Sequence, residues 1–411
     1  KIGDFMMKLR PHQDRIVENM TTNPKGQVIV PTGGGKTLCM IKDAQREFNS
    51  CSWDVFLKKP QRKTIVVVSP RILLAQQHCD EFEEWMGLHP MLQHKVLHVH
   101  SGHVSGDSTT NPDSIREWEA SQYRFNKLIL TTYHSLHRIQ ESGINVDTIY
   151  FDEAHNSVQR HFYPATEFFA GLDNVRCYFF TATPKYNKSV ESPSMDDKEI
   201  YGEEIERISA RELIDKGYIL PPKLFVKELE MTEAGRTPVT KECQHLLETI
   251  DECGVDKVLI CARRIAQIVN LVDDTNFCKE LSSRGYSWMY ITAKTGAVVD
   301  GKKVDRESFF NTLNEWGKDD TKRFVVLHHS ILSEGINVKG LEAVLFLRSM
   351  DYIGISQTIG RVIRRGSKEK TYGLVCVPVY SKVGISTARR VQAVVDLVFQ
   401  QGEPAVSVMT R

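Results

Sequence analysis

Near its amino end the chain reads Gln27-Val28-Ile29-Val30-Pro31-Thr32-Gly33-Gly34-Gly35-Lys36-Thr37, and an apolar, helix-like stretch follows. The β-branched run Val28–Val30 predicts a strand that ends in the glycine loop. Three consecutive glycines permit positive φ angles and bring backbone N–H groups close to an anion, and the next helix directs its own N–H groups there. Strand, loop and helix in this order predict a phosphate-binding P-loop.

Each part of this loop has an expected role. The backbone of residues 32–35 is expected to surround the phosphates of a nucleotide. Lys36 is expected to reach the β- and γ-phosphates, and Thr37 to bind Mg²⁺ through its hydroxyl. Val30 stands where the strict P-loop pattern has its first glycine. The alternative interpretation is a glycine turn before an ordinary helix.

Composition limits the classes to which the chain can belong. Of its 411 residues 41% are hydrophobic, which is enough for folded cores and excludes disordered and fibrous classes. Lys plus Arg number 53 and Asp plus Glu 52, so the net charge is +1 and any polyanion site must be local. Apolar runs are all far shorter than the ~20 residues of a membrane span, so we expect no membrane partner and no secretory leader.

The cysteines and histidines are candidates for disulfide bonds or a metal site. The nine cysteines are scattered without a Cys-x-x-Cys pair, which indicates free thiols and an intracellular, reducing compartment such as the cytoplasm or the nucleus or nucleoid. A zinc site is one interpretation of the histidines at positions 94, 98, 100 and 103. We favour a surface loop for them, because Gly102 and Gly106 interrupt the region.

Short apolar runs recur through both halves of the chain. They are continuous and do not alternate with polar residues, which is typical of parallel strands buried on both faces. The fold class is therefore α/β, with two tandem domains that each contain an open parallel sheet flanked by helices. The runs are Val28–Val30, Thr64–Ser69, Lys127–Thr131, Thr148–Phe151 and Cys177–Thr181, then Val258–Cys261, Ser287–Thr292, Phe324–Leu327, Ala343–Leu347 and Tyr372–Val377.

The two sets of runs are joined by a polar segment. Ser189–Lys198 indicates a loop, and Arg207–Lys216 a short helix that Pro221-Pro222 ends. Further loops are expected at Gly102–Pro112 and Lys294–Arg306. We expect a first domain over residues 1–205, a linker over 206–222, a second domain over 223–395 and a tail over 396–411.

The sequence Asp152-Glu153-Ala154-His155 follows the predicted strand Thr148–Phe151. A carboxylate at the carboxyl end of a buried parallel strand lies beside a P-loop. Asp152 is placed to hold Mg²⁺ through water, and Glu153 to orient or deprotonate the attacking water. An accidental Asp-Glu pair at a loop start is common, but it is uncommon on a strand downstream of a P-loop.

These motifs resemble, in order and spacing, those of superfamily-two helicases and translocases of the DEAH type. The details are similar to the group of restriction-enzyme motor subunits, XPB-type helicases and UvsW-like phage recombination helicases. The matching segments are Leu9-Arg10-Pro11-His12-Gln13 for adenine recognition, Gly33–Thr37 for motif I, Asp152–His155 for motif II, Thr181-Ala182-Thr183-Pro184 for motif III, Ser333-Glu334-Gly335-Ile336-Asn337 for motif V, and Gln357–Arg365 for motif VI.

The resemblance implies two RecA-like domains with ATP bound between them. Gln13 would recognise adenine with Arg10 beside it, although a plain helix-start residue is the alternative for Gln13. Gly335 would contact the nucleotide. Asn337 stands where many relatives have an Asp that contacts the ribose, which weakens the ribose assignment.

Motifs II, III and VI would supply catalysis and coupling. Arg361 and Arg364 are three residues apart, so on a helix they share a face. Arg364 would be the arginine finger, with Arg361 beside it and Gln357 near the attacking water. A solvated basic helix is the alternative for this segment. Three further residues would couple the nucleotide state to the nucleic-acid grip: His155, Thr181 and Thr183.

Phosphate contacts in this family need hydroxyls, backbone N–H groups and cations at strand ends. Several loops that follow predicted strands carry such residues, and this repetition supports the assignment more than any single member does. For each residue alone, a turn or a solvated position is the alternative. The candidates are Pro70, Arg71, Thr131, Thr132, Tyr133, Arg263, Arg264, Lys294 and Thr295.

The sequence thus predicts an ATP- and Mg²⁺-dependent helicase or translocase that steps along nucleic acid, with DNA preferred and RNA possible. One alternative is a nucleic-acid-stimulated ATPase that remodels or clamps without unwinding, as the motor subunit of a larger complex. Distant alternatives are an inactive nucleotide-gated binding module and a small-molecule P-loop kinase. We expect the isolated chain to be a monomer.

Overall fold

The computed structural model describes two compact units. The first contains the chain up to Ile208 except Thr32–Gly34, with the segment from Val406, and the second contains Ser209–Ala405 together with Thr32–Gly34. Thr32–Gly34 are described with unit 1, because they connect β1 (Lys25–Ile29) to α2 (Lys36–Asn49). Within these units the described residues are 8–50, 53–54, 59–60, 62–86, 93–187, 189, 191–230, 238–329, 338, 340–365, 370–403, 405 and 407–408.

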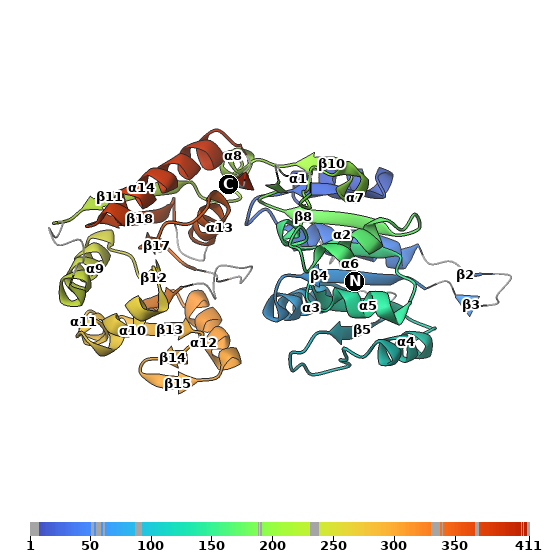
Figure 1. The fold of residues 1–411 in the computed structure, drawn as a ribbon, viewed down its shortest axis with the longest axis horizontal. Helices are drawn as coiled ribbons and strands as arrows, with labels where there is room; N and C mark the ends of the chain where they lie inside the picture. Colours follow the sequence, from blue (N-terminus) through green and yellow to red (C-terminus); the bar gives the residue numbers. More distant parts are fainter. Residues whose placement is uncertain are drawn as a thin grey trace, which may run out of the picture. The chain divides into compact units, whose positions relative to one another are not determined.

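Unit 1 is built around a seven-stranded sheet, and all of its strand pairs are parallel (Figure 1). Its order is β10 (Glu203–Arg207), β1 (Lys25–Ile29), β8 (Arg176–Thr181), β7 (Thr148–Phe151), β4 (Thr64–Ser69), β6 (Asn126–Thr132) and β5 (His94–Val99). The helices are α1 (Pro11–Thr22), α2 (Lys36–Asn49), α3 (Ile72–Met86), α4 (Pro112–Ser121), α5 (Leu136–Ser142), η1 (Ala154–Asn156), α6 (Tyr163–Ala170) and α7 (Lys198–Tyr201). Two small pairs, β2 (Trp53–Asp54) with β3 (Lys59–Pro60) and β9 (Lys185–Tyr186) with β19 (Ser407–Val408), complete the unit.

Unit 2 contains an eight-stranded sheet whose first six strands are parallel. Its order is β11 (Pro222–Glu228), β18 (Gly373–Val379), β17 (Ala343–Phe346), β12 (Lys257–Cys261), β16 (Phe324–His328), β13 (Ser287–Thr292), β14 (Gly296–Val299) and β15 (Lys302–Val304). The helices are α8 (Ala210–Asp215), α9 (Val239–Cys253), α10 (Ile265–Asp273), α11 (Phe277–Ser283), α12 (Arg306–Lys318), α13 (Tyr352–Val362), α14 (Lys382–Val394) and η2 (Val395–Gln400).

The fold class is confirmed, since every predicted run forms a strand and both sheets are mainly parallel. Two segments expected to be loops differ. His94–Val99 forms edge strand β5, with His98 and His100 buried, because the strand pairs with β6. The segment Lys294–Arg306 contains the antiparallel pair β14 and β15, which extends the second sheet beyond β13.

The boundary between the units differs from the expected linker over residues 206–222. β10 pairs with β1 as an edge strand of the first sheet, whereas α8 belongs to unit 2, so the division falls after Ile208. The expected tail over 396–411 is also divided. η2 continues α14 in unit 2, and β19 pairs with β9 in unit 1.

No helix among the described residues has the length and apolar character needed to cross a membrane. In the same part of the chain eight cysteines are free thiols, and five of them are buried. Cys51 lies outside the described residues.

A buried polar network fixes helix α2, which follows the P-loop, to the sheet of unit 1. Asp43 of α2 is fully buried, and it accepts hydrogen bonds from the Tyr150 hydroxyl at 2.6 Å and from the Arg176 guanidinium at 3.2 Å. Arg176 also pairs with Glu47 of α2 at 2.8 Å. A buried carboxylate needs such partners, because burial without them would cost several kcal/mol.

The Asp43→Ala variant is expected to lose about 3–5 kcal/mol of stability in unit 1, because the buried partners lose their counter-charge. Native-state hydrogen exchange of the β7 and β8 amides measures this unit separately from unit 2. The control is Glu141→Ala, which removes an exposed ion pair to Arg138 and should cost about 0–1 kcal/mol. Equal effects of the two variants would contradict the structural role of Asp43.

Candidate functional site

The sheet order in unit 1 gathers the predicted motifs at one edge. β8 lies between β1 and β7, and β4 lies on the other side of β7. All these strands are parallel, so their carboxyl ends meet at one edge of the sheet. The segments at and just after the carboxyl ends of β1, β8, β7 and β4 are the P-loop, motif III, motif II and Ser69-Pro70-Arg71.

The P-loop has the backbone that its glycines predict. Gly33 and Gly35 have φ angles of 87° and 82°, and Gly35 is the N-cap of α2. Lys36 is the first residue of that helix and Thr37 the second. The loop therefore leads into a helix amino terminus, a position whose backbone N–H groups and dipole favour phosphate binding.

Lys36 is placed beside motif II. Its ammonium lies 3.0 Å from Oε1 of Glu153, and both side chains are almost fully buried. Glu153 has φ 46° and ψ 53°, a left-handed backbone that non-glycine residues rarely adopt. Strained backbone of this kind gathers at functional sites, where the surrounding structure holds it in place. The lysine and the glutamate predicted to act on one triphosphate thus lie within hydrogen-bond distance.

Asp152 is buried, and its carboxylate has a partner that the sequence did not reveal. Nε2 of His78 on α3 lies 2.9 Å from Oδ2 of Asp152. Burial raises the pKa of Asp152, but the hydrogen bond and charge of His78, together with the charge of Lys36, outweigh burial and hold that pKa below its ordinary value. Burial lowers the pKa of His78, and the hydrogen bond and charge of Asp152 more than compensate, so that it is raised.

A sequence signal for His78 did exist. Leu74, His78, Phe82 and Met86 are spaced by four residues and are all buried, so they form the core-facing stripe of α3. A histidine within an apolar stripe needs a polar partner in the interior. The sequence could therefore have marked His78 as paired, but it could not have identified Asp152 as the partner.

The predicted coupling residues are in contact with one another. Nδ1 of His155 lies 3.0 Å from Oγ1 of Thr181 and 3.4 Å from Oγ1 of Thr183. The backbone N–H of Thr183 donates to Oγ1 of Thr181 at 3.0 Å, and both threonines are fully buried. His155 also lies 3.7 Å from Oε2 of Glu153. Motifs II and III thus form one continuous polar cluster.

The predicted adenine-recognition residues lie at the start of α1. Arg10 is the N-cap, and its backbone N–H donates to Oε1 of Gln13 at 2.8 Å. Nε2 of Gln13 donates to the carbonyl oxygen of Gly35 at 3.2 Å. Gln13 therefore caps its own helix, as the alternative interpretation expected, and it also holds the P-loop.

In unit 2, the predicted finger residues lie on and after α13. Gln357 and Arg361 are helical, and Arg361 is buried. The helix ends at Val362, so Arg364 lies after it. The expectation that Arg361 and Arg364 share a helix face is therefore wrong. Gly335 and Asn337 lie outside the described residues.

The cationic candidates for nucleic-acid contact are exposed and follow strands. Thr295 supports one of them, because its hydroxyl lies 2.6 Å from that of Thr292 and shapes the turn between β13 and β14. The exposed cations are Arg71 after β4, Arg263 and Arg264 after β12, and Lys294 after β13.

The uncharged candidates lie at or just after the carboxyl ends of β4 and β6, and they are less accessible than the cations. Pro70, Thr131, Thr132 and Tyr133 are buried. The hydroxyl of Thr131 donates to the carbonyl oxygen of Val99 at 2.8 Å, and the hydroxyl of Tyr133 donates to the carbonyl oxygen of Asp152 at 2.9 Å. These two hydroxyls bind carbonyl oxygens within unit 1, and their expected contact with nucleic acid stays a prediction.

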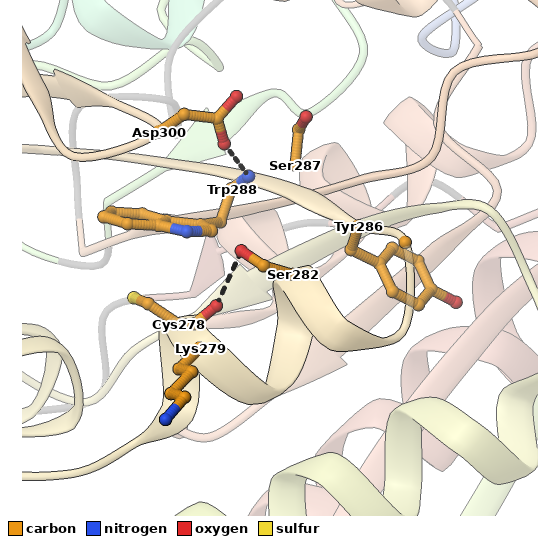
Figure 2. A pocket seen from close by; sticks show the side chains of 8 residues that line it. Cys278, Lys279, Ser282, Tyr286, Ser287, Trp288 and Asp300 are labelled. Carbon is orange, nitrogen blue, oxygen red and sulfur yellow. Dashed lines mark hydrogen bonds between the residues drawn. The ribbon is translucent and has the colours of Figure 1, made fainter.

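Two open pockets lie apart from these residues. One, of about 520 Å³, is lined by residues of α11 and the start of β13 together with Asp300, as Figure 2 shows. It therefore sits at the amino end of β13, opposite the edge that carries Lys294. The other, of about 790 Å³, is lined by Tyr163, Tyr186 and polar residues up to Asp197. Neither contains a predicted site residue.

Comparisons with known proteins agree with this arrangement. The family model "Type III restriction enzyme, res subunit" matches residues 6–186, the part that carries the P-loop and motif II. A comparison of the sequence with curated proteins found no match.

Solved structures match nearly the whole chain. The Type ISP restriction-modification enzyme LlaBIII bound to DNA has a TM-score of 0.69 at 17% identity, with 98% of this chain and 31% of that chain covered. Mss116p bound to ssRNA and AMP-PNP has a TM-score of 0.64 at 15% identity, with 98% and 75% covered. Dbp5 L327V of S. cerevisiae, bound to RNA and ADP BeF3, has a TM-score of 0.62 at 13% identity, with 98% and 90% covered.

The two units therefore have the fold of tandem RecA-like domains, and the resemblance to superfamily-two helicases and translocases is confirmed. The chain spans about a third of the length of the Type ISP enzymes that it matches.

The Gly35→Ala variant is expected to lower the affinity for a fluorescent ATP analogue about tenfold or more. A Cβ at this position would lie 2.2 Å from Nε2 of Gln13, on a backbone with φ 82°. The control is Gly143→Ala, at φ 67° with nothing within 4 Å of the added Cβ. If Gly35→Ala bound the analogue as tightly as Gly143→Ala, the close approach of Gly35 to Gln13 would not be required for nucleotide binding.

Proposed function

We propose that this chain is an ATP-dependent nucleic-acid translocase or helicase that acts on DNA. The observation that carries the proposal is the contact between Lys36 and Glu153, at the edge of the sheet where motif III also ends. A P-loop lysine and a motif II glutamate held 3.0 Å apart are positioned for one γ-phosphate and its attacking water.

The residues of unit 1 divide the chemistry among them. The loop backbone and Lys36 would hold the phosphates and stabilise the charge that develops on them. Glu153 would accept the proton of the attacking water or orient that water. Its contacts with Lys36 and His155 keep the carboxylate oriented toward the P-loop. Gln13 and Arg10 would contribute to adenine recognition.

The residues also fit Mg²⁺. Oδ1 of Asp152 is buried and has no hydrogen-bond partner among the described residues, so it is an acceptor available to a cation or its water shell. Thr37 is the second residue of the helix after the P-loop, and its hydroxyl can serve as a ligand. Mg²⁺ bound by Thr37 and Asp152 would neutralise charge on the phosphate oxygens.

Unit 2 would supply the arginine finger and part of the nucleic-acid grip. We assign the finger to Arg364, with Arg361 and Gln357 beside it, and a nucleotide contact to Gly335 with Asn337. The exposed cations after β4, β12 and β13 would bind phosphates, with Pro70, Thr132 and Thr295 contributing backbone or hydroxyl groups. His155, Thr181 and Thr183 would couple this grip to the nucleotide state, because they connect motif II to motif III.

DNA is the preferred polymer because the family model and the first matched structures are those of restriction enzymes. RNA remains the alternative polymer, since Mss116p and Dbp5 are described as bound to RNA. The second candidate function is that of a nucleic-acid-stimulated ATPase that remodels or clamps without unwinding, as the motor subunit of a larger complex, because the matching family model describes a restriction-enzyme subunit. We expect the isolated chain to be an intracellular monomer.

ATP hydrolysis is expected to rise about tenfold or more with DNA, because the cationic loops must hold phosphates for the motor to cycle. The measurement compares single-stranded DNA, duplex DNA, forked DNA and RNA with no polymer, at one salt concentration. Equal rates with and without every polymer would remove the motor interpretation. Stimulation by RNA alone would retain the motor and correct the polymer.

Forked DNA and a triplex separate the two candidate functions. A helicase separates the strands of forked DNA, whereas a translocase that does not unwind displaces the third strand of a triplex and leaves the fork paired. ATP hydrolysis stimulated by nucleic acid without activity on either substrate would favour the second candidate function.

The Glu153→Gln variant is expected to bind ATP but to hydrolyse it at a rate at least about 10²-fold lower, because the amide cannot accept the proton of water. Lys36→Ala should lose both tight binding and turnover. Single-turnover hydrolysis and analogue binding distinguish the two outcomes. The control is Glu141→Gln, an exposed glutamate of α5. A Glu153→Gln chain with the wild-type rate would refute the assignment of Glu153.

A further inference from the structure

The Asp152 carboxylate is held by three neighbouring segments of unit 1. Its backbone N–H donates to the carbonyl oxygen of Val68 in β4, and its carbonyl oxygen accepts the hydroxyl of Tyr133 after β6, each at 2.9 Å. Its side chain contacts His78 of α3. The first two bonds fix the backbone only. The His78 contact acts on the carboxylate itself, where the backbone N–H of Glu153 also contributes.

The two carboxylate oxygens have different surroundings. Oδ2 lies 2.9 Å from Nε2 of His78, whereas Oδ1 has no hydrogen-bond partner among the described residues. Both side chains are at least nine-tenths buried, at 2% exposure for His78 and 6% for Asp152. Water cannot replace the missing bond freely at such a site. The histidine thus occupies one oxygen and leaves the other available.

His78 is itself held in place. It lies on the core-facing stripe of α3, a helix of 15 residues. The first turn of α3 begins at Arg71, whose carbonyl oxygen accepts the N–H of Ala75 at 3.0 Å. A ring packed on a regular helix has little freedom to rotate, so its N–H can hold an acceptor in a fixed direction.

We propose that His78 is a positioning residue for the metal site: it binds Oδ2 of Asp152 and thereby directs Oδ1 toward the Mg²⁺ of the nucleotide. This inference rests on the proposed function and extends it to a residue outside the helicase motifs. Groups that hold a metal-binding carboxylate commonly affect metal affinity about 10- to 100-fold when removed.

The test compares His78→Leu, which fills the buried space without a donor, with His78→Gln, whose amide N–H can replace that of Nε2. The affinity for a fluorescent ATP analogue is measured for each variant in Mg²⁺ and in EDTA. For the Leu variant, the ratio of the affinity in Mg²⁺ to the affinity in EDTA is expected to be about tenfold smaller than for the wild-type chain. Its affinity in EDTA should stay unchanged. The Gln variant should retain most of the gain.

A second readout does not depend on turnover or on the fluorescent analogue. Binding of Mn²⁺ in the presence of ATP, followed by electron paramagnetic resonance, should weaken about tenfold in His78→Leu and only slightly in His78→Gln. His78→Met serves the same comparison if circular dichroism shows that the Leu variant is misfolded. The control is His245→Leu, a buried histidine of unit 2 that we assign to no site.

The outcomes separate this inference from the function on which it rests. If the wild-type chain gained affinity from Mg²⁺ and His78→Leu gained as much, the inference alone would be overturned. It would also be overturned if the affinities in Mg²⁺ and EDTA fell together, or if the Leu and Gln variants were equally impaired. A wild-type chain that bound no nucleotide would overturn both proposals.

Discussion

Lys36 and Glu153 meet because two strands far apart in the sequence pair with the same neighbour. β1 and β7 both lie beside β8 in parallel register, and Ile29 pairs with Thr181 while Phe151 pairs with Phe179. The residues that follow the three strands therefore emerge together at one edge. The contact at 3.0 Å between the lysine and the glutamate follows from this strand order, and every role assigned to unit 1 depends on it.

That edge carries two acids that are largely or fully buried, and each has its own basic partner. Glu153 pairs with Lys36, and Asp152 with His78. A buried carboxylate without such a partner would be neutralised by proton uptake. The separate pairing is compatible with the separate tasks proposed for the two acids, one toward water and the other toward a metal ion. The Asp43 network contacts the same helix that presents Lys36, and loss of one of its members would leave an uncompensated buried group beneath that helix.

The interior of both sheets could be predicted from the sequence, because strands buried on both faces are continuous apolar runs. The edge strands could not. β10 reads Glu203-Glu204-Ile205-Glu206-Arg207, and it forms only because β1 offers it a free edge. β5 has histidines and a lysine among its apolar residues for the same reason. Of the candidate site, the motifs predicted which residues gather at the edge, but the His78 contact depends on the docking of α3, which no local pattern encodes.

The polar candidates at strand ends fall into two groups, buried hydroxyls and exposed cations. A hydroxyl can be buried when it makes one hydrogen bond inside the protein. The hydroxyl of Thr131 donates to the carbonyl oxygen of Val99, and that of Tyr133 to the carbonyl oxygen of Asp152. A guanidinium or ammonium group is rarely buried without a matching acid, so in the same positions Arg71 and Lys294 remain at the surface. Whether a strand-end side chain is buried therefore depends more on its charge than on its position. The phosphate contacts proposed above accordingly rest on the few exposed cations, which are local and agree with a net charge of only +1.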